Sequence, residues 1–148
     1  MNRASPRMRR FARHLIDISA LENSGNVGSN ASFPVTDTLR PHLKLLMGTG
    51  GTRQLLAREI TLATVEVSWL HSVRVTERGE LEGLDQIRSF IDPVEFLEGR
   101  VILLAQLLGL LVAFIGPTLT SRMVGEFWPQ IPFRDRNFGE DNQNEEAS

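Results

Sequence analysis

The three histidines are the residues of this chain best suited to metal binding or acid–base chemistry, but their spacing argues against both. His14, His42 and His71 are far apart in sequence, and none has a carboxylate or a second histidine at ligand spacing. Glu95 and Glu98 have a spacing used by di-iron sites in helical bundles, but the accompanying histidine is missing. We therefore predict no metal site and expect both glutamates to serve the beginning of a helix.

A glycine-rich turn at residues 48–52 is the other candidate for chemistry. A helix that begins after such a turn can bind an anion through its free amide groups and its dipole. A phosphate-binding loop also needs a lysine after the last glycine and a strand before the loop, whereas here Arg53 follows and a helix is expected before. We interpret the segment first as a turn between helices and keep one candidate anion site. That site consists of Gly50, Gly51, Thr52 and Arg53.

No catalytic constellation is visible in the rest of the sequence. The chain contains no cysteine, which excludes disulfides, thiol catalysis and cysteine-ligated metals. It also lacks the Gly-x-Ser-x-Gly motif of a nucleophile elbow. We therefore expect no catalytic residue and no cofactor, and we lean towards a protein that is not an enzyme.

The N-terminal part of the chain predicts a basic amphipathic helix. Ser5 and Pro6 suit the start of a helix, and apolar residues then recur at spacings of three and four over residues 8–21. Arginines occupy the other face, which could contact nucleic acid or an anionic membrane, although a solvated basic face is the simpler interpretation. A secretory signal is rejected because charged residues interrupt the apolar stretch. An arginine-rich, acid-free start also fits a mitochondrial presequence, but Asp17 and Glu22 soon end that character.

Two further helices are expected over residues 35–47 and 52–67. Because Pro41 lies inside the first, that helix should either begin near Thr38 or kink at Arg40. The second has a broad apolar stripe. The charged residues expected to lie mostly off this stripe are Arg53, Arg58, Glu59 and Glu66.

The middle of the chain changes character. Alternating residues allow a short β-hairpin near 73–81, which would be marginal unless it packs on another element. A short helix should follow over 84–91. Asp92 and Pro93 then form the best helix start in the chain, because aspartate can cap and proline suits the first helical position.

A Leu-rich helix over 101–115 is either the centre of a helical bundle or a membrane span. Its uninterrupted apolar run is short for a bilayer, and extending the span to 101–119 requires crossing Gly116 and Pro117. The other predicted helices each have an apolar face that needs covering. We therefore favour the core helix and keep membrane anchoring through 101–119 as the alternative.

Charge is distributed unevenly along a chain whose net charge is only −2. The N-terminal helix is rich in arginine, whereas Glu140, Asp141, Glu145 and Glu146 make the other end acidic. We expect one helical domain over 1–131, with a polar loop at 23–34, and a mobile acidic tail over 132–148. The tail would partly screen the basic helix.

Three stretches of the chain are distinctive: 39–43 (LRPHL), 81–84 (LEGL) and 103–111 (LLAQLLGLL). On these stretches, residues 39–128 resemble small bacterial helical proteins that have no assigned activity. The resemblance implies a folded bacterial domain and assigns no functional residue.

Together these patterns predict an all-α single domain of five or six helices around a Leu-rich central helix, with a small hairpin near 73–81. The leading functional hypothesis is a non-enzymatic interaction or regulatory protein in the cytoplasm, which binds a protein partner or forms a homo-oligomer. Membrane association through 101–119 and small-ligand or anion binding at the turn 48–52 are the alternatives. We expect no nucleic-acid partner.

Overall fold

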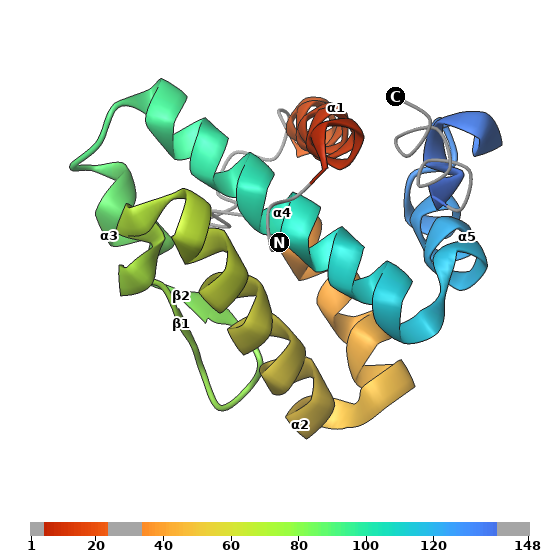
Figure 1. Cartoon of the computed structure of the whole chain (residues 1–148), viewed down its shortest axis with the longest axis horizontal. Helices are drawn as coiled ribbons and strands as arrows, with labels where there is room; N and C mark the ends of the chain where they lie inside the picture. Colours follow the sequence, from red (N-terminus) through yellow and green to blue (C-terminus); the bar gives the residue numbers. More distant parts are fainter. Residues whose placement is uncertain (1–4, 24–33, 139–148) are drawn as a thin grey trace.

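The computed structural model describes residues 5–23 and 34–138 and shows a mainly helical fold (Figure 1). The elements in chain order are α1 (Pro6–Asn23), α2 (Pro34–Glu66), the 3₁₀-helix η1 (Ser68–Ser72), β1 (Arg74–Val75), β2 (Leu81–Glu82), α3 (Leu84–Arg88), α4 (Pro93–Ile115), α5 (Pro117–Phe127) and the 3₁₀-helix η2 (Phe133–Arg136). The predicted helical class is confirmed, with five α-helices and one small hairpin among the described residues. The predicted polar loop at 23–34 falls largely outside those residues.

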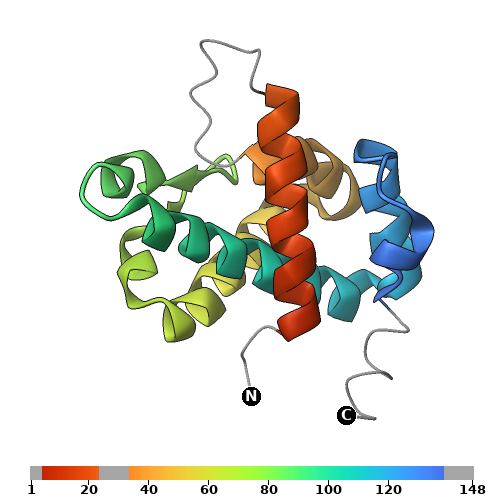
Figure 2. The same ribbon diagram turned by 90° about the horizontal axis from the view of Figure 1, so that it is seen from above.

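Helix α4 forms the centre of the bundle. Figure 1 shows α2 beside α4 and α5 at its end, and Figure 2 shows α1 crossing over it. Every residue from Val101 to Leu108 is buried, so this part of α4 is covered on all sides. Each leucine buried in this way contributes roughly 1.5–3 kcal/mol. The predicted Leu-rich central helix is therefore the main apolar contributor to the core.

The same helix is long and apolar enough to cross a membrane. It has 23 residues and a mean hydropathy of 1.9 in its most apolar stretch, of which 56% is buried inside the protein. Exposure increases towards its end, where Gly109, Ala113 and Phe114 reach the surface. The middle of α4 is thus a core helix, and its last turns form part of the protein surface.

Gly48 divides α2 into a first arm, 34–47, and a second arm, 49–66. Its φ of 76° and ψ of 172° leave the helical region, and positive φ favours glycine because a side chain would be strained there. Figure 1 shows the chain turning sharply between the two arms. The predicted break at the glycine-rich turn is confirmed.

The first arm begins earlier than the proline at position 41 suggested. It starts at Pro34 rather than near Thr38, and the kink expected at Arg40 is absent, since Gly48 is the interior residue of α2 with non-helical angles. Pro41 is exposed. Proline has no amide hydrogen to donate to the carbonyl group four residues earlier in the helix, and at this exposed position water can bond that carbonyl group instead.

The hairpin is small and is supported by its contacts. Val75 pairs with Leu81 in the antiparallel register, and both side chains pack against the core. The turn is closed by the Thr76 amide donating to the Glu80 carbonyl at 2.8 Å, while Gly79 supplies a φ of 78°. Packing on the core explains why a hairpin this short is present.

The beginning of α4 has the predicted cap and an unexpectedly tight contact. The Asp92 carboxylate accepts a hydrogen bond from the Val94 amide at 2.7 Å. About two turns after the cap, Trp69 packs directly on Gly99, where an added Cβ would lie 2.2 Å from the indole ring. The indole also stacks on Phe96, with ring centroids 6.0 Å apart. Glycine is therefore required at position 99 to seat η1 on α4.

The packed domain extends further than residue 131. We expected a mobile tail from residue 132, but the Arg136 guanidinium donates to the carbonyl and hydroxyl oxygens of Ser121 at 2.9 and 3.0 Å. Phe138 is buried and meets Phe11 edge to face, with ring centroids 5.2 Å apart. Residues 133–138 are mostly polar, and each of these contacts depends on a single side chain. No repeating apolar pattern could therefore indicate that this segment packs on the domain. The remaining part of the expected tail, 139–148, lies outside the described residues.

Candidate functional site

The structure divides the residues of the candidate anion site. Gly50 and Arg53 line a shallow hollow of about 480 Å³, to which the hairpin contributes Arg74. Thr52 is buried, and its hydroxyl group donates to the Gly48 carbonyl at 2.8 Å. Gly51 does not line the hollow. The hydroxyl group is thus used to hold the break in α2, and two arginines are what this hollow can offer to an anion.

The histidines remain apart in the folded chain. His14 is exposed on α1, His42 meets the ring of Phe127 at 5.7 Å, and the Nδ1 atom of His71 lies 2.8 Å from the Ser68 carbonyl oxygen. Within residues 5–23 and 34–138, no group of three or more His, Asp or Glu side chains is arranged to hold a metal ion. Local contacts account for His42 and His71, whereas His14 lies on the surface.

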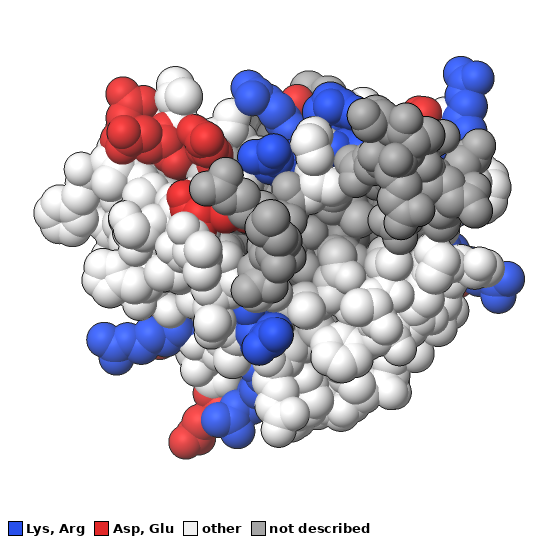
Figure 3. All heavy atoms as spheres, in the orientation of Figure 1, with Lys and Arg blue, Asp and Glu red and all other residues white. Residues whose placement is uncertain are grey.

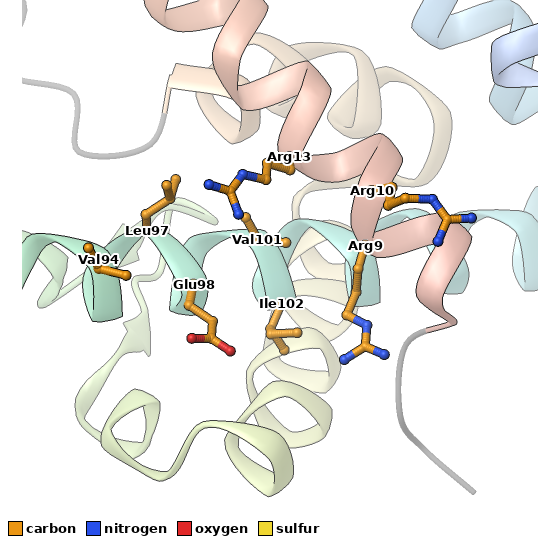
Figure 4. A pocket seen from close by; sticks show the side chains of 8 residues that line it. All are labelled: Arg9, Arg10, Arg13, Val94, Leu97, Glu98, Val101 and Ile102. Carbon is orange, nitrogen blue, oxygen red and sulfur yellow. The ribbon is translucent and has the colours of Figure 1, made fainter.

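A groove between α1 and α4 combines charge with apolar surface (Figure 4). It has a volume of about 330 Å³. We call it the arginine groove. Its lining residues are Arg9, Arg10 and Arg13 from α1 and Val94, Leu97, Glu98, Val101 and Ile102 from α4.

The periodicity of α1 places the arginines at this groove. Met8, Phe11, Ala12 and Leu15 are buried against the core, and the arginines between them lie on the outer sides of the same helix. Figure 4 shows Arg9 and Arg13 extending from α1 along opposite sides of Val101 and Ile102, while Arg10 points to the other side of α1. The charged groups therefore border a strip of α4.

None of the three guanidinium groups forms an ion pair or hydrogen bond with a side chain of the described chain. Three arginines face a single glutamate, Glu98, among the lining residues. Figure 3 shows Lys and Arg atoms gathered over α1 and acidic atoms gathered nearer the beginning of α4. The groove thus offers unused donors that favour a negatively charged group.

The floor of the groove is aliphatic. Val101 and Ile102 are buried beneath it, whereas Leu97 is half-buried and Val94 is 71% exposed. Among the described residues, no serine, threonine or histidine lines the groove, and Glu98 is the one lining carboxylate. Chemically the groove can bind a molecule that carries both carboxylate groups and aliphatic surface, and Glu98 has no described catalytic partner in the lining.

Glu59 is the most unusual titratable residue in the described chain. The sequence pattern suggested that it lies off the apolar stripe of α2, but its side chain is fully buried. Neither carboxyl oxygen has a hydrogen-bond partner. Burial raises the pKa of this carboxyl group well above its usual value, so the protonated form is favoured.

Glu66, also expected to lie off the apolar stripe, has a specific partner. Its carboxylate accepts a hydrogen bond at 3.0 Å from Nε2 of Gln106, the polar residue within the apolar run of α4. The pair connects the second arm of α2 to the middle of α4. Glu66 and Gln106 therefore have hydrogen-bond partners, whereas neither carboxyl oxygen of Glu59 has one among the described residues.

Comparisons with known protein families, with curated proteins and with solved structures find no match for this chain. The resemblance to small bacterial helical proteins consequently stays a prediction. The arginine groove was not anticipated, because sequence spacing shows that α1 has a basic face but not which helix lies beneath it. The available signal was the pair Arg9 and Arg13, four residues apart on one side of a helix.

Proposed function

We propose that this protein is a non-enzymatic interaction module that binds an acidic, amphipathic segment of a partner protein in the arginine groove. The observation that supports this proposal is the position of three arginines, which have no side-chain partner among residues 5–23 and 34–138, beside an aliphatic strip of α4. Carboxylates of the partner would accept hydrogen bonds from Arg9 and Arg13. Aliphatic side chains of the partner would cover Val94 and Leu97, which are partly exposed.

The chemistry of the lining favours a peptide over a nucleic acid. Single-stranded nucleic acids are held largely by stacking of bases on aromatic side chains, and none of the described residues that line the groove is aromatic. Glu98 would repel a phosphate backbone, which carries a charge at every nucleotide, whereas a peptide can place an uncharged side chain opposite Glu98. An amphipathic acidic helix satisfies both the arginines and the aliphatic floor.

Fluorescence anisotropy with a designed probe tests this function. The probe is a fluorescein-labelled helical peptide with glutamates on one face and leucines on the other, and the comparison peptide carries lysines in place of the glutamates. We expect the Glu/Leu peptide to bind, and the double variant R9A/R13A to bind it roughly two- to thirty-fold more weakly, since exposed ion pairs contribute about 0.2–1 kcal/mol each. R58A, which removes an exposed arginine on α2, serves as the matched control.

Two results would contradict the proposal. One is equal binding of the Glu/Leu and Lys/Leu peptides, which would show that charge does not select the partner. The other is a dissociation constant for the Glu/Leu peptide that is the same in wild type, R9A/R13A and R58A. That result would place the binding site outside the arginine groove.

A second candidate function, membrane association, is favoured by an uncharged face of the molecule. No charged residue occurs between Arg100 and Arg122, and Figure 3 shows a broad surface without charged atoms at its lower right, where α4 ends. Phe114 is 68% exposed at this end of α4, and Leu119 on α5 is 38% exposed. Exposed apolar patches of this kind mark protein or membrane contacts.

Flotation with neutral phosphatidylcholine vesicles separates this candidate from the first. Membrane association predicts that the protein floats with the vesicles and that F114S/L119S abolishes flotation while R9A/R13A does not. A protein that stays in the soluble fraction, with or without these substitutions, would exclude a membrane role for the uncharged face.

A further inference from the structure

Two arginines share one aromatic ring at the end of the molecule where α3, the end of α2 and the beginning of α4 meet (Figures 1 and 2). The ring is that of Phe96, which is 4% exposed. The Cζ atom of Arg100 lies 5.2 Å from the ring centroid, and that of Arg88 lies 5.7 Å from it. Trp69 stacks on the same ring. We call these four side chains the Phe96 cluster.

Helical spacing explains how the cluster forms. Arg100 follows Phe96 by four residues, so both lie on one side of α4, and a long helical side chain leans back over the preceding turn. Arg88 comes from a separate element, as the last residue of α3. Phe96 is two residues from both Val94 and Glu98, which is about 200° around a helix. Because Val94 and Glu98 line the arginine groove, the groove and the Phe96 cluster lie on opposite sides of α4.

The two guanidinium groups have no anionic partner in the part of the chain that the structure describes. Neither forms an ion pair or a hydrogen bond within residues 5–23 and 34–138. The Nε atom of Arg100 is buried, yet its N–H group has no acceptor. Asp92, one turn before Phe96, is used as the cap of α4. The cluster therefore carries positive charge that its described surroundings do not neutralise.

This arrangement favours a bound anion over a bound water molecule. A buried polar group without a partner commonly marks a position that a water molecule or an ion completes. The ring of Phe96 attracts both cations through its π electrons, but it does not replace a hydrogen-bond acceptor for the Nε–H group. Burial and the charge of Arg88 both lower the pKa of Arg100. An anion would relieve the repulsion between the two arginines as well as accept the hydrogen bond, whereas water would do only the second.

We propose that Arg88 and Arg100 together bind a phosphate group beside Phe96, either as free phosphate or as a small phosphate monoester. A phosphate monoester carries about 1.5–2 negative charges at pH 7 and three strong acceptor oxygens, so it can engage both guanidinium groups at once. A carboxylate has a single charge, and its two oxygens match the fork of one arginine. The site is separate from the arginine groove and does not depend on the proposed function.

NMR titration of the full chain with inorganic phosphate, at constant ionic strength in sodium chloride, tests this site. The reporters are the Nε–H signal of Arg100, assigned by its loss in R100K, and the indole N–H signal of Trp69. We expect both signals to shift and saturate, with a dissociation constant in about the millimolar range. An equal concentration of added chloride should leave both signals in place.

Variants locate the bound phosphate. R88A, at an exposed position, should weaken phosphate binding by roughly two- to fivefold. R100K should weaken it by at least about tenfold, because lysine keeps the charge but loses the Nε–H donor and the fork of the guanidinium group. R58A, which removes an exposed arginine elsewhere on α2, is the matched control and should bind phosphate as the wild type does.

Three results would overturn the proposal. The first is a folded wild-type protein in which phosphate causes no saturable shift of the Arg100 signal. The second is an equal shift with chloride, which would indicate general screening of charge. The third is phosphate binding that R88A leaves as tight as in R58A, and this comparison stands even if R100K fails to fold. Methyl phosphate then distinguishes the two sources of the ligand, since binding as tight as that of phosphate indicates a monoester and weaker binding indicates free phosphate.

Discussion

Replacement of Glu59 by glutamine should leave the free energy of unfolding nearly unchanged at low pH and should change how that free energy depends on pH. Glutamine has nearly the same shape, so packing in the bundle is preserved. Because burial raises the pKa of Glu59 in the folded protein, the unfolded chain releases this proton at lower pH than the folded one does. Stability from this residue is therefore fully present below the unfolded-state pKa of about 4.3 and is lost as the pH rises towards the folded-state pKa.

The magnitude follows from that proton difference. Over this window the wild-type free energy of unfolding should fall, relative to that of E59Q, by about 1.4 kcal/mol for each pH unit. The two proteins should be nearly equally stable at about pH 4, and E59Q should be increasingly the more stable as the pH rises. For a domain of this size, each kcal/mol corresponds to a shift of roughly 2–4 °C in Tm.

Urea unfolding followed by tryptophan fluorescence measures this difference, since Trp128 is buried and Trp69 is partly covered. Titrations at intervals from about pH 4 to about pH 7 give the two stability curves. E77Q, an exposed substitution in the hairpin turn, is the matched control and should follow the wild type. Parallel curves for wild type and E59Q across this range would refute the argument, because they would show that Glu59 has the same pKa in both states.

Three further predictions concern stability and are checked by thermal unfolding. G99A should destabilise the protein by about 1–3 kcal/mol, because the added methyl group would lie 2.2 Å from the Trp69 ring. In G109A, on the same helix, the added methyl group meets nothing within 4 Å, so this variant should be more stable than the wild type by up to about 1 kcal/mol. Equal effects of the two substitutions would contradict the packing described at position 99. D92A should lower stability by about 1 kcal/mol through loss of the helix cap, and an unchanged Tm would show that the cap does not hold α4. R136A should cost about 1–3 kcal/mol by freeing η2 from α5, and no change would indicate a mobile segment after all.

Much of the fold could be predicted because local signals decide it. Gly48 breaks α2 where positive φ is required, and the Asp92 carboxylate caps α4 at the expected position. The hairpin forms where residues alternate. In each case the sequence contains the residue type whose backbone or hydrogen-bonding preference determines the local structure.

The features that escaped prediction depend on which elements meet. Glu59 is buried because α2 has neighbours on more sides than its apolar stripe indicates. Phe138 belongs to the core through a single ring contact with Phe11, which no periodicity could reveal. The arginine groove exists because α1 crosses over α4, an arrangement that neither helix specifies alone.

A charge swap tests the central claim most directly. R9E/R13E exchanges the two groove arginines for glutamates, and its Tm and circular dichroism establish that the fold is kept. We predict that this variant loses binding of the Glu/Leu peptide and gains binding of the Lys/Leu peptide, measured by fluorescence anisotropy in the same buffer. A folded variant that keeps the wild-type preference for the Glu/Leu peptide would contradict the claim that the arginine groove selects an acidic partner.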